Sequence, residues 1–350
     1  MTKAFLRVLQ KYIYNFFLQL EFKANINKYH IKENSKNNYF FVLDLSSFYA
    51  NFDILRYLIY LAIKSKYKLV NIVIIPELET LGKIIGKEKN FSSGNYFRQI
   101  NIVYPLMNMI EDFNPNIFFA KSREEAYKFI GDSKVRYLSN PYKSTKRNSI
   151  FEKLLFRFYT KKNYVPKLKV NLHSLNLVKK ILNTNESKKI ITITIKNTSY
   201  KPLENSNYEA WERVAKKLIS EGFRVIFIRD FEDYIYDKKY EPSFHYFDHA
   251  IIDPQIRLAI YKLSYLNLGV CGGPFNSFIF FSDCNFLCFK SEILKELDYV
   301  RRFGFKDISK DFQFPFFNNN QKIIYKDDNY KNIIEELNFF FKKNKEKIIL

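Results

Sequence analysis

The stretch LNLGVCGGPFNS, residues 266–277, runs from a hydrophobic strand through a glycine turn directly into a predicted helix at 275–281. Three of the nine glycines of the chain, Gly269, Gly272 and Gly273, lie within it. Glycine permits positive φ angles and close approach of backbone N–H groups to a ligand, and a helix N-terminus favours an anion. The stretch therefore predicts a phosphate-binding turn, with a tight ligand-free turn as the alternative. The predicted site residues are Gly272, Gly273, Pro274, Asn276 and Ser277.

Strands and helices alternate along the second half of the chain around this turn. This alternation predicts a doubly wound, mostly parallel α/β sheet. The predicted strands are 190–195, 224–228, 266–270, 285–289 and 323–325. The predicted helices are 172–182, 208–221, 254–263, 275–281 and 329–342.

The first half has the same character. Two hydrophobic runs, 39–45 and 70–75, flank a helical pattern at 53–66, which predicts a β-α-β unit with parallel strands. Further along, 96–110 has a helical pattern despite Pro105. Shorter elements are predicted at 117–120, 123–129 and 135–138.

Length and composition fit two domains. The chain has 350 residues, of which 47% are hydrophobic, enough for two packed cores. A segment at 161–169 is the expected linker. We predict a Rossmann-like domain at 1–165 and another at 166–350, facing each other across a cleft.

The chain carries a formal net charge of +21 and is rich in Phe and Tyr, a bias typical of AT-rich genomes. A basic surface attracts nucleic acid, anionic lipid and phosphorylated molecules. No nucleic-acid-binding module is recognisable. The charge therefore favours an anionic membrane surface or a phosphorylated ligand, and no specific nucleic acid is expected.

Cysteine use and hydropathy indicate a cytoplasmic protein. The three cysteines, Cys271, Cys284 and Cys288, form no C-x-x-C pair, so we predict buried free thiols and neither disulfides nor a zinc site. No signal peptide and no membrane span are predicted. No cofactor is expected.

Residues 3–23 read as an amphipathic helix. Leu6, Leu9, Ile13, Phe16, Phe17 and Leu20 share one face, and basic residues recur on the other. This pattern fits a helix lying in a membrane interface. It equally fits a helix packed on the protein's own core.

A second polar cluster follows the predicted strand 190–195. In a parallel sheet its end lies on the same side as the glycine turn, where Lys196 could neutralise a diphosphate. Ser206 or Asn207 is the predicted N-cap of the next helix. The other residues predicted to bind substrate here are Asn197, Thr198, Asn205 and Arg229, the last as a base or ribose contact or as a surface ion pair.

In the first half, Asp44 and Glu77 follow predicted strands and are candidate general bases facing the cleft. Arg98 begins the aromatic-rich segment and is a further candidate for substrate binding. The chain has no Asp-x-Asp motif, which argues against a metal-bridged diphosphate. Lysine, backbone N–H groups and a helix dipole would then hold the phosphate charge.

These residues carry a resemblance to a known family. The region 191–233 reads as a strand, KNTSY, NSNY, a helix with Trp211 and EGFRVIFIRD. Together with the Gly272–Pro274 turn, FLCFK at 286–290 and NYFRQINIVYPLMNMI at 95–110, it resembles bacterial GT-B-fold glycosyltransferases of surface-polysaccharide biosynthesis. The resemblance covers about half the chain, and Lys196 stands where many relatives are expected to have arginine.

The resemblance implies a glycosyltransferase that transfers a sugar from a nucleotide-sugar donor to a glycan or lipid-linked acceptor, without a metal, at the inner face of the plasma membrane. The glycine turn and Lys196 would then hold the departing diphosphate, with Asp44 as the base. Two alternatives remain open: a non-catalytic nucleotide-sugar-binding protein, and a nucleotide-sugar epimerase of similar two-domain fold.

Overall fold

In the computed structural model the chain divides into two units, Met1–Phe151 and Glu152–Leu350. The division falls before the linker expected from the sequence, and the limits 1–165 and 166–350 stay a prediction. The structure describes residues 13, 16, 17, 20, 21, 24, 39–45, 52, 54–65, 70–76, 99–131, 136–137, 157–162, 164–183, 188–199, 202–236, 240–273, 275, 278, 282–289 and 312–346.

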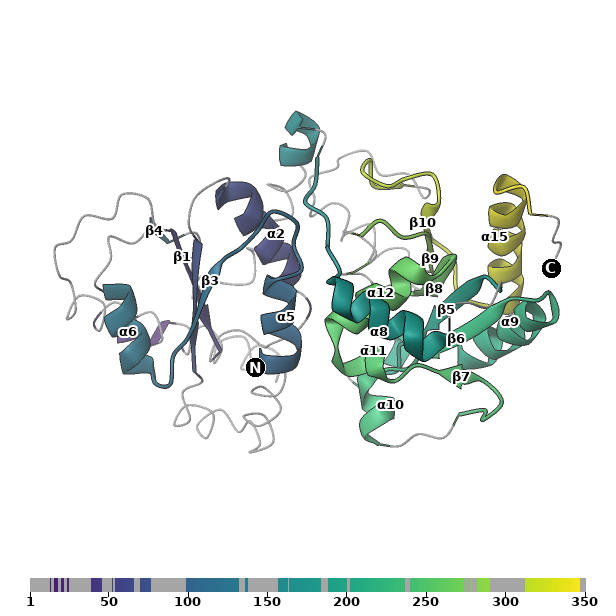
Figure 1. The fold of residues 1–350 in the computed structure, drawn as a ribbon, viewed down its shortest axis with the longest axis horizontal. Coiled ribbons are helices and arrows are strands. Elements are labelled where there is room, and N and C mark those ends of the chain that lie inside the picture. Colours follow the sequence, from purple (N-terminus) through teal and green to yellow (C-terminus); the bar gives the residue numbers. More distant parts are fainter. Residues whose placement is uncertain are drawn as a thin grey trace, which may run out of the picture. The chain divides into compact units, whose positions relative to one another are not determined.

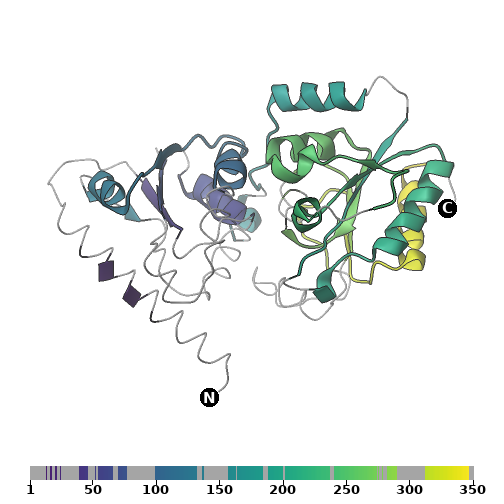
Figure 2. The same ribbon diagram turned by 90° about the horizontal axis from the view of Figure 1, so that it is seen from below.

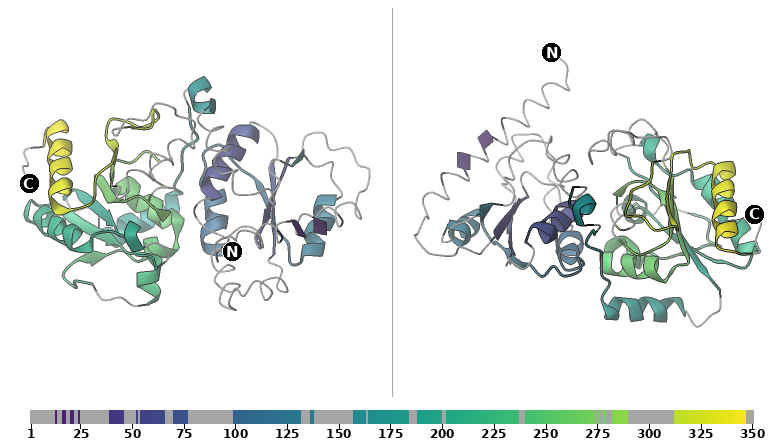
Figure 3. Two further views of the ribbon diagram at one scale, coloured as in Figure 1. Left: turned by 180° about the vertical axis from the view of Figure 1, so that it is seen from behind. Right: turned by 90° about the horizontal axis from the view of Figure 1, so that it is seen from above.

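The first unit contains a parallel sheet of order β3-β2-β1-β4. Figures 1 and 3 show α2 and α5 on one face of this sheet and α6 on the other. The strands are β1 (Tyr39–Asp44), β2 (Val70–Ile75), β3 (Asn116–Phe119) and β4 (Arg136–Tyr137). The helices are α2 (Ile54–Ser65), the π-helix η1 (Gln99–Val103), α5 (Tyr104–Met107) and α6 (Arg123–Gly131).

The predicted β-α-β unit is confirmed. β1 and β2 pair in parallel from Tyr39 opposite Val70 to Asp44 opposite Ile75, and α2 connects them. All six residues of β2 are buried, as expected for a parallel strand covered on both faces.

The helix predicted at 96–110 is confirmed over 99–107 of the described residues, but it ends three residues earlier and is partly π-helical. The chain there forms a π-helical turn, Gln99–Val103, followed by a short α-helix, Tyr104–Met107. Pro105 lies in the first turn of that α-helix. Proline has no N–H to donate and its ring crowds the preceding turn, so that turn takes the wider π form while the helix continues.

The second unit contains a parallel sheet of order β10-β9-β8-β5-β6-β7. Figure 2 shows α8 and α12 on one face and α9 and α15 on the other. The strands are β5 (Ile190–Thr194), β6 (Arg224–Ile228), β7 (His245–Tyr246), β8 (Leu266–Val270), β9 (Phe286–Phe289) and β10 (Gln321–Ile324). The helices are α8 (Leu172–Leu182), the 3-10 turn η3 (Pro202–Glu204), α9 (Tyr208–Ser220), α10 (Phe231–Ile235), α11 (His249–Ile252), α12 (Pro254–Leu263) and α15 (Tyr330–Lys343).

The direction in which the chain adds strands to this sheet reverses at β5. From β5 the chain proceeds outward to β6 and β7, and then returns to the other side of β5 with β8, β9 and β10. Both units are therefore layered α/β structures with parallel sheets, as predicted, and the second is doubly wound. In such sheets ligands bind at the carboxyl ends of the strands where the order reverses, here between β5 and β8.

Local signals set the ends of α9. Asn207 is its N-cap, accepting a hydrogen bond from the backbone N–H of Ala210 at 3.2 Å. Gly222 follows its C-terminus at a φ of +88°, which glycine adopts without strain. The N-cap was predicted from the sequence, with Ser206 as the other candidate.

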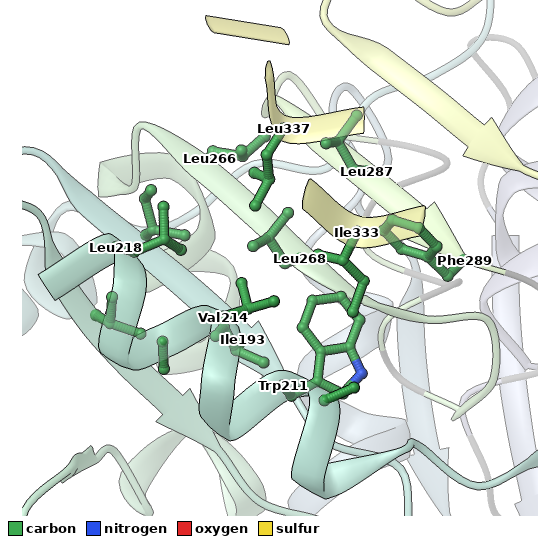
Figure 4. Packing of buried hydrophobic residues seen from close by; sticks show 14 of the residues in the cluster. Ile193, Trp211, Val214, Leu218, Leu266, Leu268, Leu287, Phe289, Ile333 and Leu337 are labelled. Carbon is green, nitrogen blue, oxygen red and sulfur yellow. The ribbon is translucent and has the colours of Figure 1, made fainter. Parts of the chain in front are cut away.

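The core of the second unit centres on Trp211, which is fully buried between α9 and the sheet (Figure 4). Its ring meets that of Phe289 edge to face with 5.5 Å between centroids. Its Nε1 donates to Oδ2 of Asp328 at 2.7 Å, and the backbone N–H of Asn207 donates to the same oxygen at 2.8 Å. The Asp328 carboxylate thus joins the starts of α9 and α15.

The described part of the N-terminal segment has an exposed apolar face. Ile13, Phe16, Phe17 and Leu20 are helical and between 46% and 58% exposed. This face does not pack on the core, so the second interpretation of the amphipathic pattern is wrong for these four side chains. In the part of the chain that the structure describes, no helix is long and apolar enough to cross a membrane.

Candidate functional site

Lys196 and the glycine turn meet at the carboxyl ends of β5 and β8. The two strands pair directly, with Thr194 opposite Gly269, and each runs two residues beyond its end into a candidate residue. A Cβ on Gly272 would lie 2.8 Å from Lys196 Nζ and 2.9 Å from its Cδ and Cε. The lysine stem therefore lies directly on the Gly272 backbone. The sequence-based expectation that Lys196 and this turn share one side of the sheet is met.

The three clustered glycines have three different roles. Gly269 lets β8 approach β5, because a Cβ there would lie 2.8 Å from the carbonyl oxygen of Thr194. Gly272, at a φ of +148°, leaves room for the Lys196 side chain. Gly273 has a φ of +48°, and a Cβ there would meet nothing within 4 Å. Gly269 and Gly272 therefore serve packing within the protein, whereas Gly273 supplies a backbone conformation that glycine adopts without strain.

The polar segment after β5 is held by side chains from a strap at 202–206. The Lys196 backbone N–H donates to Ser206 Oγ at 2.9 Å, and the Ser206 N–H donates to the Lys196 carbonyl at 2.8 Å. Asn205 accepts from the Thr198 N–H at 2.9 Å and donates to the Asn197 side-chain oxygen at 3.1 Å. Asn197, Thr198 and Asn205 thus form one network beside Lys196, in which Asn205 fixes the backbone.

Lys196 has an acidic partner that the sequence analysis did not single out. Its Nζ lies 2.7 Å from Glu204 Oε2, and the lysine and glutamate side chains are 14% and 24% exposed. Glu204 ends the short turn Pro202–Glu204, which has no buried residue. No local pattern marks Glu204, because only the folding of the strap back onto β5 brings it to Lys196.

Arg229 follows β6 at the same edge of the sheet but is engaged within the protein. Its Nε and Nη2 donate to the two carboxylate oxygens of Asp248 at 3.0 and 2.5 Å. Its guanidinium also lies over the rings of Tyr234, Tyr240 and Tyr246, between 5.5 and 6.0 Å from their centroids. Of the two interpretations offered by the sequence, the ion pair is the one found.

Asp230 links the ends of β5 and β6. It is the N-cap of α10 and accepts from the backbone N–H groups of Glu232 and Asn197, each at 3.2 Å. Burial raises the pKa of the Asp230 carboxyl, although both hydrogen bonds oppose that rise. Asp233 accepts from the Asn197 side chain at 2.5 Å and from the Tyr240 hydroxyl. Asp230 and Asp233 thus hold Asn197 in place next to Lys196.

In the first unit Asp44 is fully buried at the end of β1. Its two oxygens accept from Arg123 Nη1 at 3.0 Å and Nη2 at 2.8 Å, and the same guanidinium binds Glu21 at 2.6 Å. A general base must reach the proton that it removes. The prediction that Asp44 faces a cleft as a base is therefore not supported, and its carboxylate anchors Arg123 instead.

Five predicted site residues lie outside the described part of the chain: Glu77, Arg98, Pro274, Asn276 and Ser277. The three cysteines are free and buried, as predicted. Burial raises the pKa of the Cys284 thiol to about 12. Within the described ranges, no group of His, Cys, Asp and Glu side chains is arranged to hold a metal ion.

Comparison with known proteins gives only distant structural likenesses. No family model and no curated protein matches the chain. Heptosyltransferase II of E. coli, which uses ADP-heptose in lipopolysaccharide, matches with a TM-score of 0.45 and 10% identity over 87% of this chain and 99% of that one. A glycosyltransferase family 9 protein from Veillonella parvula matches at 0.41 and 12%, over 74% and 81%. A candidate UDP-N-acetylglucosamine 2-epimerase from Listeria monocytogenes matches at 0.35 and 11%, over 89% of each. Likeness at this level carries no statement about activity.

Proposed function

We propose that the chain is a glycosyltransferase that binds a nucleotide-sugar through its second unit and transfers the sugar to a glycan or lipid-linked acceptor in surface-polysaccharide synthesis. The donor diphosphate would lie on Lys196 and the Gly272–Gly273 turn, at the reversal of strand order. In this proposal the acceptor binds the first unit, and no metal is required.

One observation carries the proposal: Lys196 lies on the Gly272 backbone at the β5–β8 switch of a doubly wound sheet. That position is where α/β sheets bind ligands. A lysine beside a glycine turn that leads into a helix suits a phosphate. The sequence resemblance to GT-B glycosyltransferases narrows the ligand from a phosphate to a nucleotide-sugar. Glycosyl transfer needs stabilisation of the departing diphosphate, which a fixed cation provides.

The second candidate is a nucleotide-sugar-binding protein without catalysis. The burial of Asp44 favours it, because this carboxylate was the base candidate within the described residues. Glu77 stays a prediction as the base, since it lies outside them.

The test is incubation with a panel of nucleotide-sugars and with glycan and lipid-linked acceptors, followed by assay of the nucleoside diphosphate released. We expect release that depends on an acceptor and is lost in Lys196→Met. The matched control is Lys216→Met, which removes an exposed lysine on α9 and should not change turnover.

Other outcomes separate the alternatives. Binding without release in the presence of every acceptor would favour the binding protein. Interconversion of sugars without an acceptor would favour an epimerase. If no nucleotide-sugar binds at all, the proposed site is wrong.

We also propose that the protein acts at the cytoplasmic face of an anionic membrane. The exposed face of Ile13, Phe16, Phe17 and Leu20 offers apolar side chains to the headgroup boundary. The net charge of +21 complements an anionic lipid surface.

Vesicle co-sedimentation tests this location. Wild-type protein should bind vesicles of phosphatidylglycerol and phosphatidylcholine, less so as salt rises. The double variant Phe16→Ser, Phe17→Ser should bind about tenfold or more weakly, from the loss of two buried rings. Phe339→Ser is the control, because Phe339 in the second unit is 59% exposed, much like Phe16 at 58% and Phe17 at 56%. Equal loss in the control, or no binding of the wild type, would contradict the proposal.

A further inference from the structure

The cation of the candidate phosphate site is already neutralised within the protein. Glu204 Oε2 lies 2.7 Å from Lys196 Nζ, and both side chains are largely shielded from water. A charged hydrogen bond in such a setting is stronger than one in bulk water. A diphosphate that reaches Lys196 therefore has to share the ammonium group with this carboxylate or displace it.

Of the two partners, the lysine is the one fixed in place. Three atoms of its side chain lie within van der Waals contact of the Gly272 backbone, as the close approach of a Cβ there shows. Its own backbone is pinned on both sides by Ser206, at 2.8 and 2.9 Å. Lys196 thus has little freedom to follow a departing partner.

Glu204 has more freedom than Lys196. It ends a single 3-10 turn in which no residue is buried, and its neighbour Leu203 is 80% exposed. The backbone anchors of the strap, Asn205 and Ser206, lie just beyond it. Displacement of the Glu204 side chain from Lys196 therefore does not require the backbone of the strap to move.

We propose that Glu204 is an internal counterion that a diphosphate displaces from Lys196 on binding. This inference rests on the proposed function of the site. In the empty protein, Glu204 keeps the half-buried ammonium group paired and in position. A ligand with one negative charge gains little by exchanging with it. A diphosphate brings several charges, so the exchange selects for diphosphates.

The proposal predicts an increase in affinity when the competing charge is removed. Glu204→Gln should bind inorganic pyrophosphate about three- to fivefold more tightly than wild type, the range that a partly exposed ion pair provides. Glu209→Gln is the matched control: it makes the same change of charge at an exposed position in the first turn of α9. Its affinity should stay within about twofold of wild type, which separates a local effect from one of net charge.

Calorimetric titration of the three proteins with pyrophosphate is the decisive experiment. Unchanged or weaker binding by Glu204→Gln would overturn the proposal, and weaker binding would mean that Glu204 itself holds the ligand. An equal gain in Glu209→Gln would also overturn it, because the gain would then reflect total charge alone. If none of the three binds pyrophosphate, the inference fails together with the site. If the gain appears with pyrophosphate but no nucleotide-sugar is turned over, the inference stands and the proposed glycosyl transfer is wrong.

Discussion

Replacing Gly272 with alanine should separate the stability of the turn from its ability to bind phosphate. The new Cβ would lie 2.8–2.9 Å from three atoms of the Lys196 side chain, closer than real Cβ contacts allow. Because these atoms belong to a side chain and not to the backbone, the clash is relieved when the new Cβ forces the ammonium group out of its position on the Gly272 backbone. The stability cost then comes mainly from the φ of +148°, about 1–3 kcal/mol.

Binding should suffer much more than folding. A hydrogen bond to a charged group contributes about 1.5–3 kcal/mol. Loss of the Lys196 contact should thus weaken diphosphate affinity by roughly tenfold to a hundredfold. Titration calorimetry measures the affinity, and urea denaturation measures the free energy of unfolding.

Gly222→Ala is the control for backbone strain. Gly222 has a φ of +88°, and a Cβ there would meet nothing within 4 Å. It follows α9, at the opposite end of β6 from the candidate site. This variant should lose comparable stability and keep its affinity. Wild-type affinity in Gly272→Ala would refute the argument that the glycine positions Lys196.

Three further predictions concern buried polar groups in the two units. Asp328→Ala should lower the free energy of unfolding by about 2–4 kcal/mol in urea denaturation, because the buried Trp211 Nε1–H and the part-buried Asn207 N–H lose their acceptor. Asp327→Ala, at the exposed neighbouring residue, should change it little. Arg123→Met should cost about 3–5 kcal/mol in the same assay by leaving the buried carboxylate of Asp44 without its partner; a loss below 1 kcal/mol would mean that the pair is unimportant. Burial raises the pKa of the Cys284 thiol to about 12, so almost no thiolate forms at pH 8 in the native protein. We therefore expect Cys284 to resist iodoacetamide at pH 8 and to react once urea unfolds the chain. Mass spectrometry of the peptides measures the modification in both states.

Much of the second sheet could be predicted from local patterns. The strands 224–228 and 266–270 and the helices 172–182 and 254–263 coincide with β6, β8, α8 and α12. Their signals are strong because each strand is mostly hydrophobic and proline or asparagine marks the helix starts. The two-residue strand β7 and the short helices α10 and α11 were missed, because elements this short carry no periodicity.

In the candidate site, too, local patterns predicted some features and not others. Lys196, Gly272 and Gly273 could be singled out because a cation and a glycine cluster follow predicted strands, and parallel strands bring such ends to one edge. The state of the charged groups could not be predicted. Arg229 pairs with Asp248, Asp44 with Arg123, and Lys196 with Glu204.

The sequence by itself determined the glycine turn of residues 266–277, its place after a buried strand and the parallel character of the sheet, because backbone preferences and hydrophobic periodicity are local properties. Only the tertiary structure decided that β8 lies beside β5, that Gly272 supports the lysine stem, and that Glu204 folds back to neutralise it. The physical reason is that strand order and ion pairing depend on which distant segments come together, and the charge of a side chain does not specify its partner.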